Sequence, residues 1–247
     1  MAAAKRSVRQ NKCGTEPGRA SMWEGKAVKA ILFDLDGTLL ESSFDTLIQE
    51  YFQGISAFFS EWLPPEQFVK HLMASTHVML ADNDPNRTNI QVFADDFFPR
   101  TNLDPGLINL FDRYYQEEFP KLKCLAKANP LAKEIVELAF ANNTKVVIAT
   151  NPVFPLAPIA ERLRWAGVLD YAYSLITHGD IMHYCKPNPN YFLEISELIG
   201  VAPEDCLMIG DDPEFDSPAA AVGMDLFLLE EGRSLADAME YISAKRR

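Results

Sequence analysis

Two carboxylates that directly follow an apolar run are the residues best suited to chemistry. Residues 27–33 are mostly apolar, and the chain then reads Asp-Leu-Asp-Gly-Thr over 34–38. This pattern predicts a buried strand that carries acids to the carboxyl end of an open α/β sheet, where such sheets bind ligands. Alternation along the strand places Asp34 and Asp36 on one side. Because two like charges so close resist ionisation, a divalent metal ion between them is the simplest remedy. A helix cap or a plain loop is the alternative interpretation.

Polar residues also follow three later apolar runs. Thr150 and Asn151 end the run at 144–150, where a hydroxyl and backbone N–H groups can cradle an anion. Lys186 lies in a loop stiffened by two prolines, which suits a positioned cation. The last group is acidic and comprises Asp211, Asp212, Glu214 and Asp216. Such a cluster is costly at a sheet edge unless a metal ion or a lysine neutralises it. Taken singly, the Thr-Asn pair is typical of a cap, and a loop lysine is usually solvated.

The elements that would position these residues alternate along the chain. Apolar runs occur at 27–33, 144–150, 171–176, 205–209 and 225–229. Between them, helical spacing is found at about 131–142, 155–167, 188–200 and 215–222. This succession predicts a parallel sheet with right-handed helical crossovers. Residues 42–129 interrupt the alternation with apolar residues at helical spacing and no clear strand, so we expect a helical insertion after the first strand.

Composition limits the classes of partner. The chain has 247 residues, 48% of them hydrophobic, which suits a globular protein of one or two domains. A formal net charge of -12 opposes binding to nucleic acid, whose affinity for proteins depends on basic surfaces. No apolar stretch approaches the ~20 residues that a membrane helix needs. The four cysteines form no CxxC pair, so neither a zinc site nor a disulfide framework is indicated. We therefore expect a cytoplasmic protein with a small-molecule substrate and no nucleic-acid or membrane partner.

Residues 1–26 differ in composition from the rest of the chain. They are basic and polar, with no helical or strand period and no apolar secretion segment. We expect a flexible tail there. A transit peptide, a cloning remnant or an upstream start are the alternatives.

The four groups of polar residues, in this order, resemble the motifs of the haloacid dehalogenase-like hydrolase superfamily, in its phosphatase branch. The matching residues are Asp34-x-Asp36-Gly37-Thr38-Leu39, Thr150-Asn151, Lys186-Pro187, and Gly210-Asp211 with Asp216. The resemblance covers residues 27 to about 230. Two residues depart from common versions of the pattern: Asp212 stands where serine or asparagine is frequent, and Glu41 where aspartate is frequent.

The resemblance implies a fold and its division into domains. The fold would be α/β, with a Rossmann-like parallel sheet sandwiched by helices and a helical cap inserted between the first two motifs. Residues 27–41 and 130–247 would form the core, and residues 42–129 the cap.

The resemblance also implies a set of catalytic residues. Asp34 would attack phosphorus to form an aspartyl-phosphate, and Asp36 would act as general acid and then as general base. Lys186 and Thr150 would assist, with Lys186 neutralising charge on the nucleophile and the phosphate.

Phosphate and metal binding would involve further residues. Thr150, Lys186 and the backbone N–H groups of Leu35 and Asn151 would hold the phosphoryl oxygens. Mg²⁺ would be bound by Asp34, by Asp211 and by the backbone carbonyl of Asp36. Asp216 would orient Lys186 or a metal-bound water, and whether Asp212 or Asp216 assists the metal is open.

The expected function is hydrolysis of a small phosphorylated metabolite by a Mg²⁺-dependent phosphatase. Asp36 favours phosphoryl transfer over carbon–halogen cleavage, because a halide leaving group needs no proton. A phosphomutase would keep the same residues, and an inactive binding or regulatory protein on this fold is the alternative from another class. The resemblance is compatible with a monomer or a homodimer.

The insertion offers candidates for recognising the rest of the substrate. Its aromatic candidates are Trp62, Phe93, Phe97, Phe98, Tyr114 and Tyr115, although aromatic residues at helical spacing are more often core. His71, His77, Arg87 and Arg100 are candidates to bind a substrate carboxylate or a second phosphate.

Overall fold

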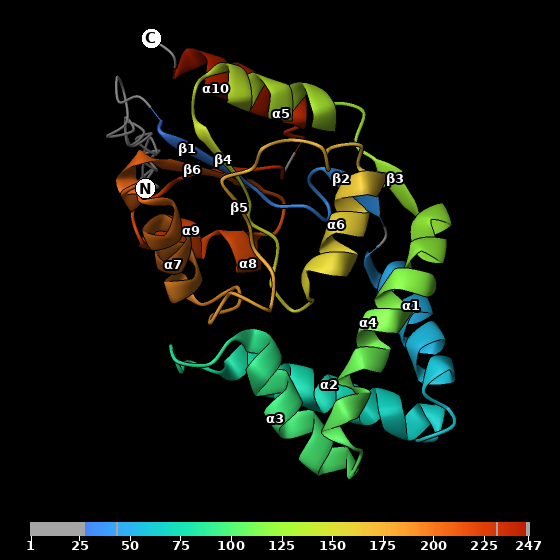
Figure 1. The fold of residues 1–247 in the computed structure, drawn as a ribbon. Coiled ribbons are helices and arrows are strands. Elements are labelled where there is room, and N and C mark those ends of the chain that lie inside the picture. The colour runs from blue at the N-terminus through green and yellow to red at the C-terminus, as the bar shows by residue number, and fades with distance from the viewer. Residues whose placement is uncertain (1–27, 43, 231, 246–247) are drawn as a thin grey trace, which may run out of the picture.

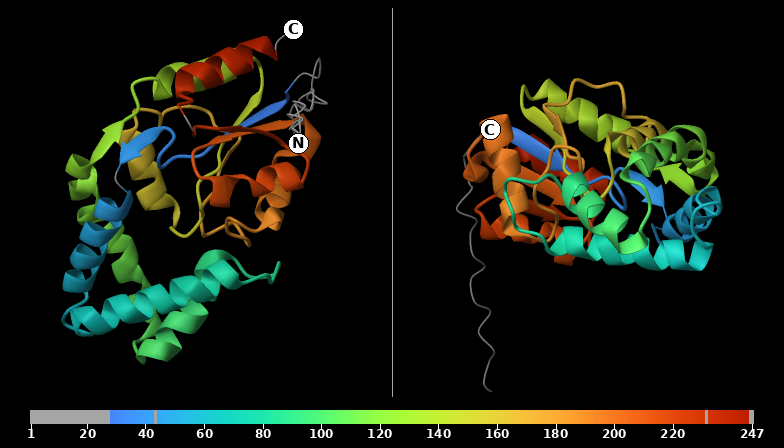
Figure 2. Two further views of the ribbon diagram at one scale, coloured as in Figure 1. Left: turned by 180° about the vertical axis from the view of Figure 1, so that it is seen from behind. Right: turned by 60° about the horizontal axis from the view of Figure 1, so that its bottom comes forward.

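The fold consists of a core built on a parallel sheet and a separate group of helices (Figure 1). The computed structural model describes residues 28–42, 44–230 and 232–245. The tail predicted for residues 1–26 lies outside the described residues. The left view of Figure 2 shows from behind that the helices between β2 (Leu40–Ser42) and β3 (Ala126–Ala128) form their own group beside the core.

The sheet contains five parallel strands in the order β5-β4-β1-β6-β7. They are β1 (Ala30–Phe33), β4 (Lys145–Ile148), β5 (Leu175–Ile176), β6 (Cys206–Gly210) and β7 (Asp225–Leu228). The central strand β1 is buried along its whole length, as expected for a parallel strand covered on both faces. This sheet confirms the predicted α/β fold with a Rossmann-like core.

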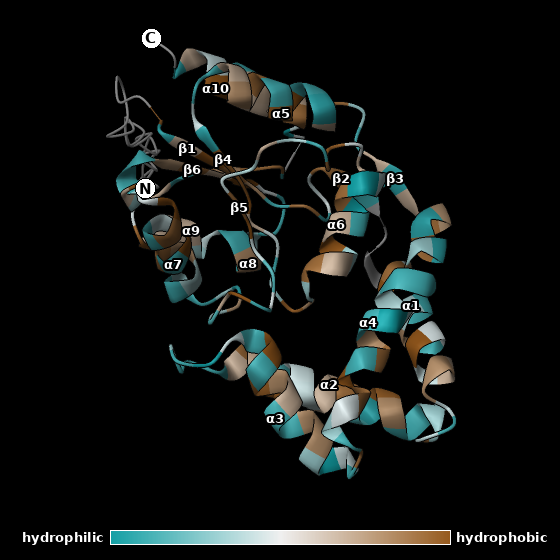
Figure 3. Cartoon of the chain, viewed as in Figure 1, coloured by the Kyte–Doolittle hydropathy of each residue, from teal (hydrophilic) through white to brown (hydrophobic). Residues whose placement is uncertain are grey.

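Alternate residues of the strands pack against different helices. Ile31 and Ile148 belong to one apolar cluster with α5 (Ala132–Ala141), α6 (Leu156–Trp165) and α10 (Leu235–Ala244). Leu32 and Val147 belong to another, with α7 (Pro189–Ile199) and α9 (Pro218–Ala221). In Figure 3 the strands are largely brown, that is hydrophobic, and the helices beside them combine hydrophobic and hydrophilic residues.

Two predicted elements differ from the structure. The run at 171–176 forms a strand only over β5, because Tyr173 N–H bonds to the carbonyl of Tyr171 in a turn. The helix expected over 215–222 is split into α8 (Pro213–Asp216) and α9. Pro218 begins α9, and because proline has no N–H it cannot continue the hydrogen bonding of α8.

The insertion contains α1 (Phe44–Phe58), α2 (Pro65–Ala81), α3 (Asn89–Thr101) and α4 (Ile108–Glu117), with the 3₁₀ helices η1 (Pro105–Leu107) and η2 (Phe119–Leu125). Two short strands that the sequence did not indicate, β2 (Leu40–Ser42) and β3 (Ala126–Ala128), pair antiparallel where the chain leaves and re-enters the core. The predicted boundaries between core and cap lie at this pair. None of the described helices combines the length and apolarity needed to cross a bilayer.

Candidate active site

The strand register brings three of the predicted site residues to one edge of the sheet. Phe33 pairs with Ile148 of β4 and with Ile209 of β6, so all three strands end at the same level. Asp34 extends this register, because its N–H donates to the carbonyl of Ile209 at 2.9 Å. Asp211 directly follows β6, and Thr150 follows β4 after one residue, Ala149. The sequence-predicted residues after β1, β4 and β6 therefore share the carboxyl edge, as open α/β sheets require of a binding site.

Lys186 lies at the centre of the site. Its side chain is 1% exposed, and Nζ donates to Asp34 Oδ1 at 2.7 Å and to Asp216 Oδ1 at 2.6 Å. Burial opposes the charge on this lysine, but the two carboxylates more than offset that cost, so the pKa of Lys186 lies above its ordinary value. The ammonium group is thus fixed in its charged form between two acids.

Asn151 holds the loop that carries the lysine. The Lys186 N–H donates to Asn151 Oδ1 at 3.2 Å, and Asn151 Nδ2 donates back to the Lys186 carbonyl at 3.4 Å. Thr150 is buried, and its carbonyl accepts hydrogen bonds from Thr177 Oγ1 at 2.7 Å and Tyr191 OH at 2.8 Å. These contacts fix the backbone from which the predicted phosphate donors extend.

The two acids whose roles the sequence left open have different contacts. Asp216 is 1% exposed and binds Lys186, and its Oδ2 accepts the N–H of Asp212 at 3.2 Å. Asp212 instead caps α8, because its Oδ1 accepts the N–H groups of Glu214 and Phe215 at 2.8 and 3.1 Å. Asp216 therefore orients the lysine, whereas Asp212 starts a helix.

Asp211 packs against the turn that follows β1. Thr38 Oγ1 donates to Asp211 Oδ1 at 3.0 Å. Gly37 has φ +86°, and a Cβ on it would lie 2.0 Å from Asp211 Oδ2, so both its conformation and its contact require glycine. Burial raises the pKa of Asp211 to about 6, against the opposing hydrogen bond from Thr38. Leu35 closes the same turn, since its carbonyl accepts the N–H groups of Leu39 and Leu40.

Asp36 pairs with Arg162, a residue that sequence reasoning missed. Arg162 Nη1 donates to Asp36 Oδ2, and the arginine is 2% exposed on α6. Its guanidinium carbon lies 5.2 Å from the ring centroid of Phe154. Asp36 Oδ1 and Arg162 Nη2 are buried without a partner in the described part of the chain. The signal was present in the sequence: an arginine stands between Ile159 and Leu163 on the apolar face of the predicted helix.

The charge balance at Asp34 favours a bound cation. Burial raises the pKa of Asp34 to about 8. The charge of Lys186 beside it acts to lower this pKa, but the carboxylates of Asp216 and Asp36 act in the opposite direction. An ionised Asp34 therefore needs more positive charge than Lys186 supplies. Carboxylate oxygens of Asp34 and Asp211 with the Asp36 carbonyl are the hard donors that Mg²⁺ prefers, so these residues fit that ion. No cluster of three or more His, Cys, Asp or Glu side chains that could hold a metal is found in the described residues. The predicted Mg²⁺ ligands include two such side chains, Asp34 and Asp211, because Asp36 would bind through its backbone carbonyl.

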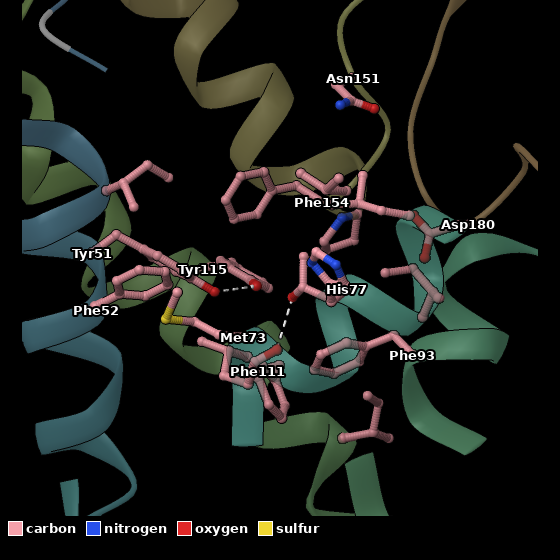
Figure 4. A pocket seen from close by; sticks show the side chains of 18 of the residues that line it. Tyr51, Phe52, Met73, His77, Phe93, Phe111, Tyr115, Asn151, Phe154 and Asp180 are labelled. Carbon is pink, nitrogen blue, oxygen red and sulfur yellow. Dashed lines mark hydrogen bonds between the residues drawn. The ribbon is translucent and has the colours of Figure 1, made fainter. Parts of the chain in front are cut away.

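A cavity of about 460 Å³ lies between the insertion and this edge of the core (Figure 4). Asn151, Phe154 and Phe215 bound it from the core, and α1, α2, α3 and α4 supply most of the remaining wall. Asn151 thus joins the lysine loop to the cavity.

Of the residues proposed from sequence for recognising the substrate, some line the cavity and others do not. Phe93, Tyr115 and His77 line it. Phe97, Phe98 and Tyr114 are buried in the aromatic core of the insertion, and Trp62 is 41% exposed. Arg87 is ion-paired with Asp82, Asp84 and Asp95, and Arg100 with Asp96. Neither arginine lines the cavity, and nor does His71.

Known proteins match most of the chain. A family model described as haloacid dehalogenase-like hydrolase matches residues 28–223. The phosphorylated carbohydrates phosphatase of Thermotoga maritima is 23% identical over 216 residues, covering 85% of this chain and 91% of that protein. The phosphoglycolate phosphatase of Escherichia coli is 26% identical over 224 residues, covering 86% and 85%. Among solved structures, a HAD phosphatase from Thermococcus onnurineus superposes with a TM-score of 0.57 at 22% identity, over 89% of this chain and 100% of that one. This last likeness supports the fold.

Proposed function

The chain belongs to the haloacid dehalogenase-like hydrolases, in their phosphatase branch, and we propose that it is a Mg²⁺-dependent phosphatase of a small phosphorylated metabolite. The observation that carries the proposal is the buried Lys186, which holds the predicted nucleophile Asp34 on one side and Asp216 on the other. A lysine so placed neutralises charge where an anionic phosphoryl group would approach.

Asp34 acts as the nucleophile. Its carboxylate attacks phosphorus in line with the ester oxygen, so a bond forms from Asp34 to phosphorus as the bond to the alcohol oxygen breaks. Lys186 fixes Oδ1 and thereby orients the carboxylate for this attack. Thr150 and the backbone N–H groups of Leu35 and Asn151 bind the phosphoryl oxygens.

Asp36 handles the protons. It gives a proton to the leaving alcohol oxygen, then takes one from the water that attacks the aspartyl-phosphate, which releases phosphate and restores Asp34. The unpartnered Oδ1 is the oxygen available for both transfers, since Oδ2 is held by Arg162. Bound by Asp34, Asp211 and the Asp36 carbonyl, Mg²⁺ would supply positive charge to the phosphoryl oxygens.

The two other candidate functions receive less support. A phosphomutase has to bind a second phosphate, and none of the described residues that line the cavity is Lys or Arg. An inactive regulatory protein would be expected to lack part of the catalytic set, whereas Asp34, Lys186 and Asp216 here retain their mutual contacts.

The test is release of phosphate from 4-nitrophenyl phosphate, with and without Mg²⁺. We expect release that depends on Mg²⁺ and falls by at least about 10³-fold in Asp34→Asn, since the amide is not a nucleophile. Release that is independent of Mg²⁺, or unchanged in the variant, would contradict the proposal. A hexose monophosphate converted to its isomer rather than to free phosphate would identify the mutase instead.

A further inference from the structure

The wall of the cavity is apolar and largely aromatic. Phe52, Met73, Phe93, Phe111, Val153 and Phe154 face it from both the insertion and the core (Figure 4). Aromatic walls of this kind bind apolar groups through the large area that they remove from water. A small polar alcohol in the cavity would leave most of this wall without a partner.

The hydroxyl groups on the wall are already hydrogen-bonded within the protein. Tyr51 OH and Tyr115 OH bond to each other at 3.0 Å, and Thr76 Oγ1 donates to the Leu72 carbonyl at 2.9 Å, as the dashed lines in Figure 4 mark. Binding a polyhydroxylated alcohol such as a sugar requires donors and acceptors that are free to form new bonds. These two bonds use two of the three hydroxyl hydrogens, so one hydrogen, on Tyr51 or Tyr115, is left to donate to a sugar.

The charged groups that face the cavity oppose a second anion. They are the carboxylates of Asp112 and Asp180. His77 also lines the cavity, but its imidazole does not repel an anion. Burial raises the pKa of Asp112, and Asp180 adds to this effect, whereas the hydrogen bond from His178 lowers the pKa of Asp180 and keeps it ionised. A carboxylate on the substrate would therefore approach a negative wall.

The arginines of the insertion and Arg162 of α6 are bound to other groups. Arg162 stacks on Phe154 from within the core, but its Nη1 is paired with Asp36. In the insertion, Arg87 and Arg100 are paired with aspartates, and Arg113 is paired with Glu117 at 3.1 Å. None of these four arginines lines the cavity.

We propose that the alcohol half of the substrate carries no negative charge and is predominantly apolar, with an aryl phosphate as its simplest form, and that esters carrying a second anionic group are poor substrates. The inference rests on the proposed phosphatase activity. It assigns the cavity to the alcohol and the Asp34–Lys186 edge to the phosphate, with Asn151 at their junction.

A matched set of three esters tests the inference: 4-ethylphenyl phosphate, 4-(carboxymethyl)phenyl phosphate and 4-(aminomethyl)phenyl phosphate. They have similar size and differ in charge at the position that would enter the cavity. We expect kcat/KM for the neutral ester to exceed that for the carboxylate by at least about 10-fold, mainly through KM, since the phosphate end is the same in all three. Hydrolysis of the carboxylate ester at least as fast as that of the neutral or the ammonium ester would overturn the inference.

A lysine placed on the wall should change this preference. Met73 lines the cavity from α2 and is 55% exposed, so Met73→Lys introduces a cation of similar length at little cost to folding. We expect it to reduce the preference for the neutral over the carboxylate ester to about 3-fold or less. Val78→Lys is the control, because Val78 is 39% exposed on the same helix but does not line this cavity. It should leave the preference unchanged.

The outcomes separate this inference from the proposed function. Mg²⁺-dependent release from the neutral ester that is lost in Asp34→Asn supports the phosphatase activity, whatever the ratio among esters. If that activity is present but Met73→Lys leaves the ratio as in the wild type, the cavity does not bind the alcohol and the inference is wrong. If no ester is hydrolysed, the proposed function fails and the inference fails with it.

Discussion

Two glycines determine how closely the carboxylates of the site pack against the strand ends. A Cβ on Gly37 would lie 2.0 Å from Asp211 Oδ2, and a Cβ on Gly210 would lie 2.0 Å from Asp216 Oδ2. Real Cβ atoms do not approach oxygen so closely, so an alanine at either position must displace a carboxylate. A substitution at Gly210 tests the Cβ contact alone, because Gly210, unlike Gly37, does not have a positive φ.

We predict that Gly210→Ala lowers kcat by about 100-fold, since displacing Asp216 by about 1 Å moves Lys186 and with it Asp34. Steady-state kinetics with 4-nitrophenyl phosphate and Mg²⁺ measure the effect. Gly106→Ala is the control, because the new Cβ would meet only an Asp104 oxygen at 3.0 Å outside the core. Wild-type kcat in a folded Gly210→Ala variant would show that Asp216 does not position the lysine.

The sequence allowed the polar residues of the site to be predicted, but few of their contacts. Asp34 and Asp211 could be found because each follows an apolar run whose end is a sheet edge, and Lys186 because it lies in a loop stiffened by two prolines. The contact of Asp216 with Lys186 is one of the two roles expected for Asp216, whereas the capping by Asp212 depends on how α8 begins, which no pattern in the sequence indicated. Their roles in catalysis and metal binding stay predictions.

At the scale of elements, α6 connects the insertion and the site. Its Arg162 pairs with Asp36, and its Trp165 stacks on Phe119 of η2 at 5.4 Å between ring centroids. A helix predicted from periodicity alone thus carries both a packing contact and the partner of the predicted general acid.

Replacing Arg162 with methionine should leave the Asp36 carboxylate without its ionic partner in a poorly solvated place. Removing one member of a buried pair costs about 3–5 kcal/mol, and because the Asp36 side chain is 13% exposed we expect about 3 kcal/mol. Urea unfolding measures this loss. We expect kcat to fall more than KM rises, because Asp36 acts in the chemical steps.

Two further variants separate a role at the site from a general loss of stability. Arg162→Lys keeps the charge and should recover part of kcat. Arg164→Met removes an arginine from the same helix that is 57% exposed and paired only with Glu161, so both kcat and stability should stay near wild type. Equal losses of kcat in Arg162→Met and Arg164→Met would contradict a specific role for Arg162.

Element prediction succeeded where one period dominated. The strands of the sheet other than β5 and the helices α5, α6 and α7 have clear apolar periods, and their centres agree with the prediction. The strands β2 and β3 were not predicted, because each has three residues and its partner is distant in sequence. The split between α8 and α9 depends on one proline that the apolar pattern does not register.

At the scale of the whole molecule, the insertion and the core share one apolar cluster. Phe59 and Phe68 of the insertion belong to the same cluster of buried residues as Ile31 and Ile148 of the sheet. Phe119 stands where the two parts meet: it is 1% exposed, stacks on Trp165 of α6 and contacts Tyr51 of α1 edge to face. The distribution of apolar residues in the sequence predicted a separate helical insertion, whereas this continuity arises only from the packing.

A continuous cluster should make the two parts unfold together. We predict that Phe119→Ala lowers the stability of the whole protein by about 3–5 kcal/mol, because it removes a buried ring and leaves a cavity at the junction. Phe119→Leu fills part of that space and should cost less. Urea unfolding followed by far-UV circular dichroism and by tryptophan fluorescence should give coincident transitions in both variants and in the wild type. If Phe119→Ala separated the transitions, or destabilised only one of two already separate transitions, the insertion would be an independently folding unit, and the cavity between the parts would depend on docking of two folded bodies rather than on one shared core.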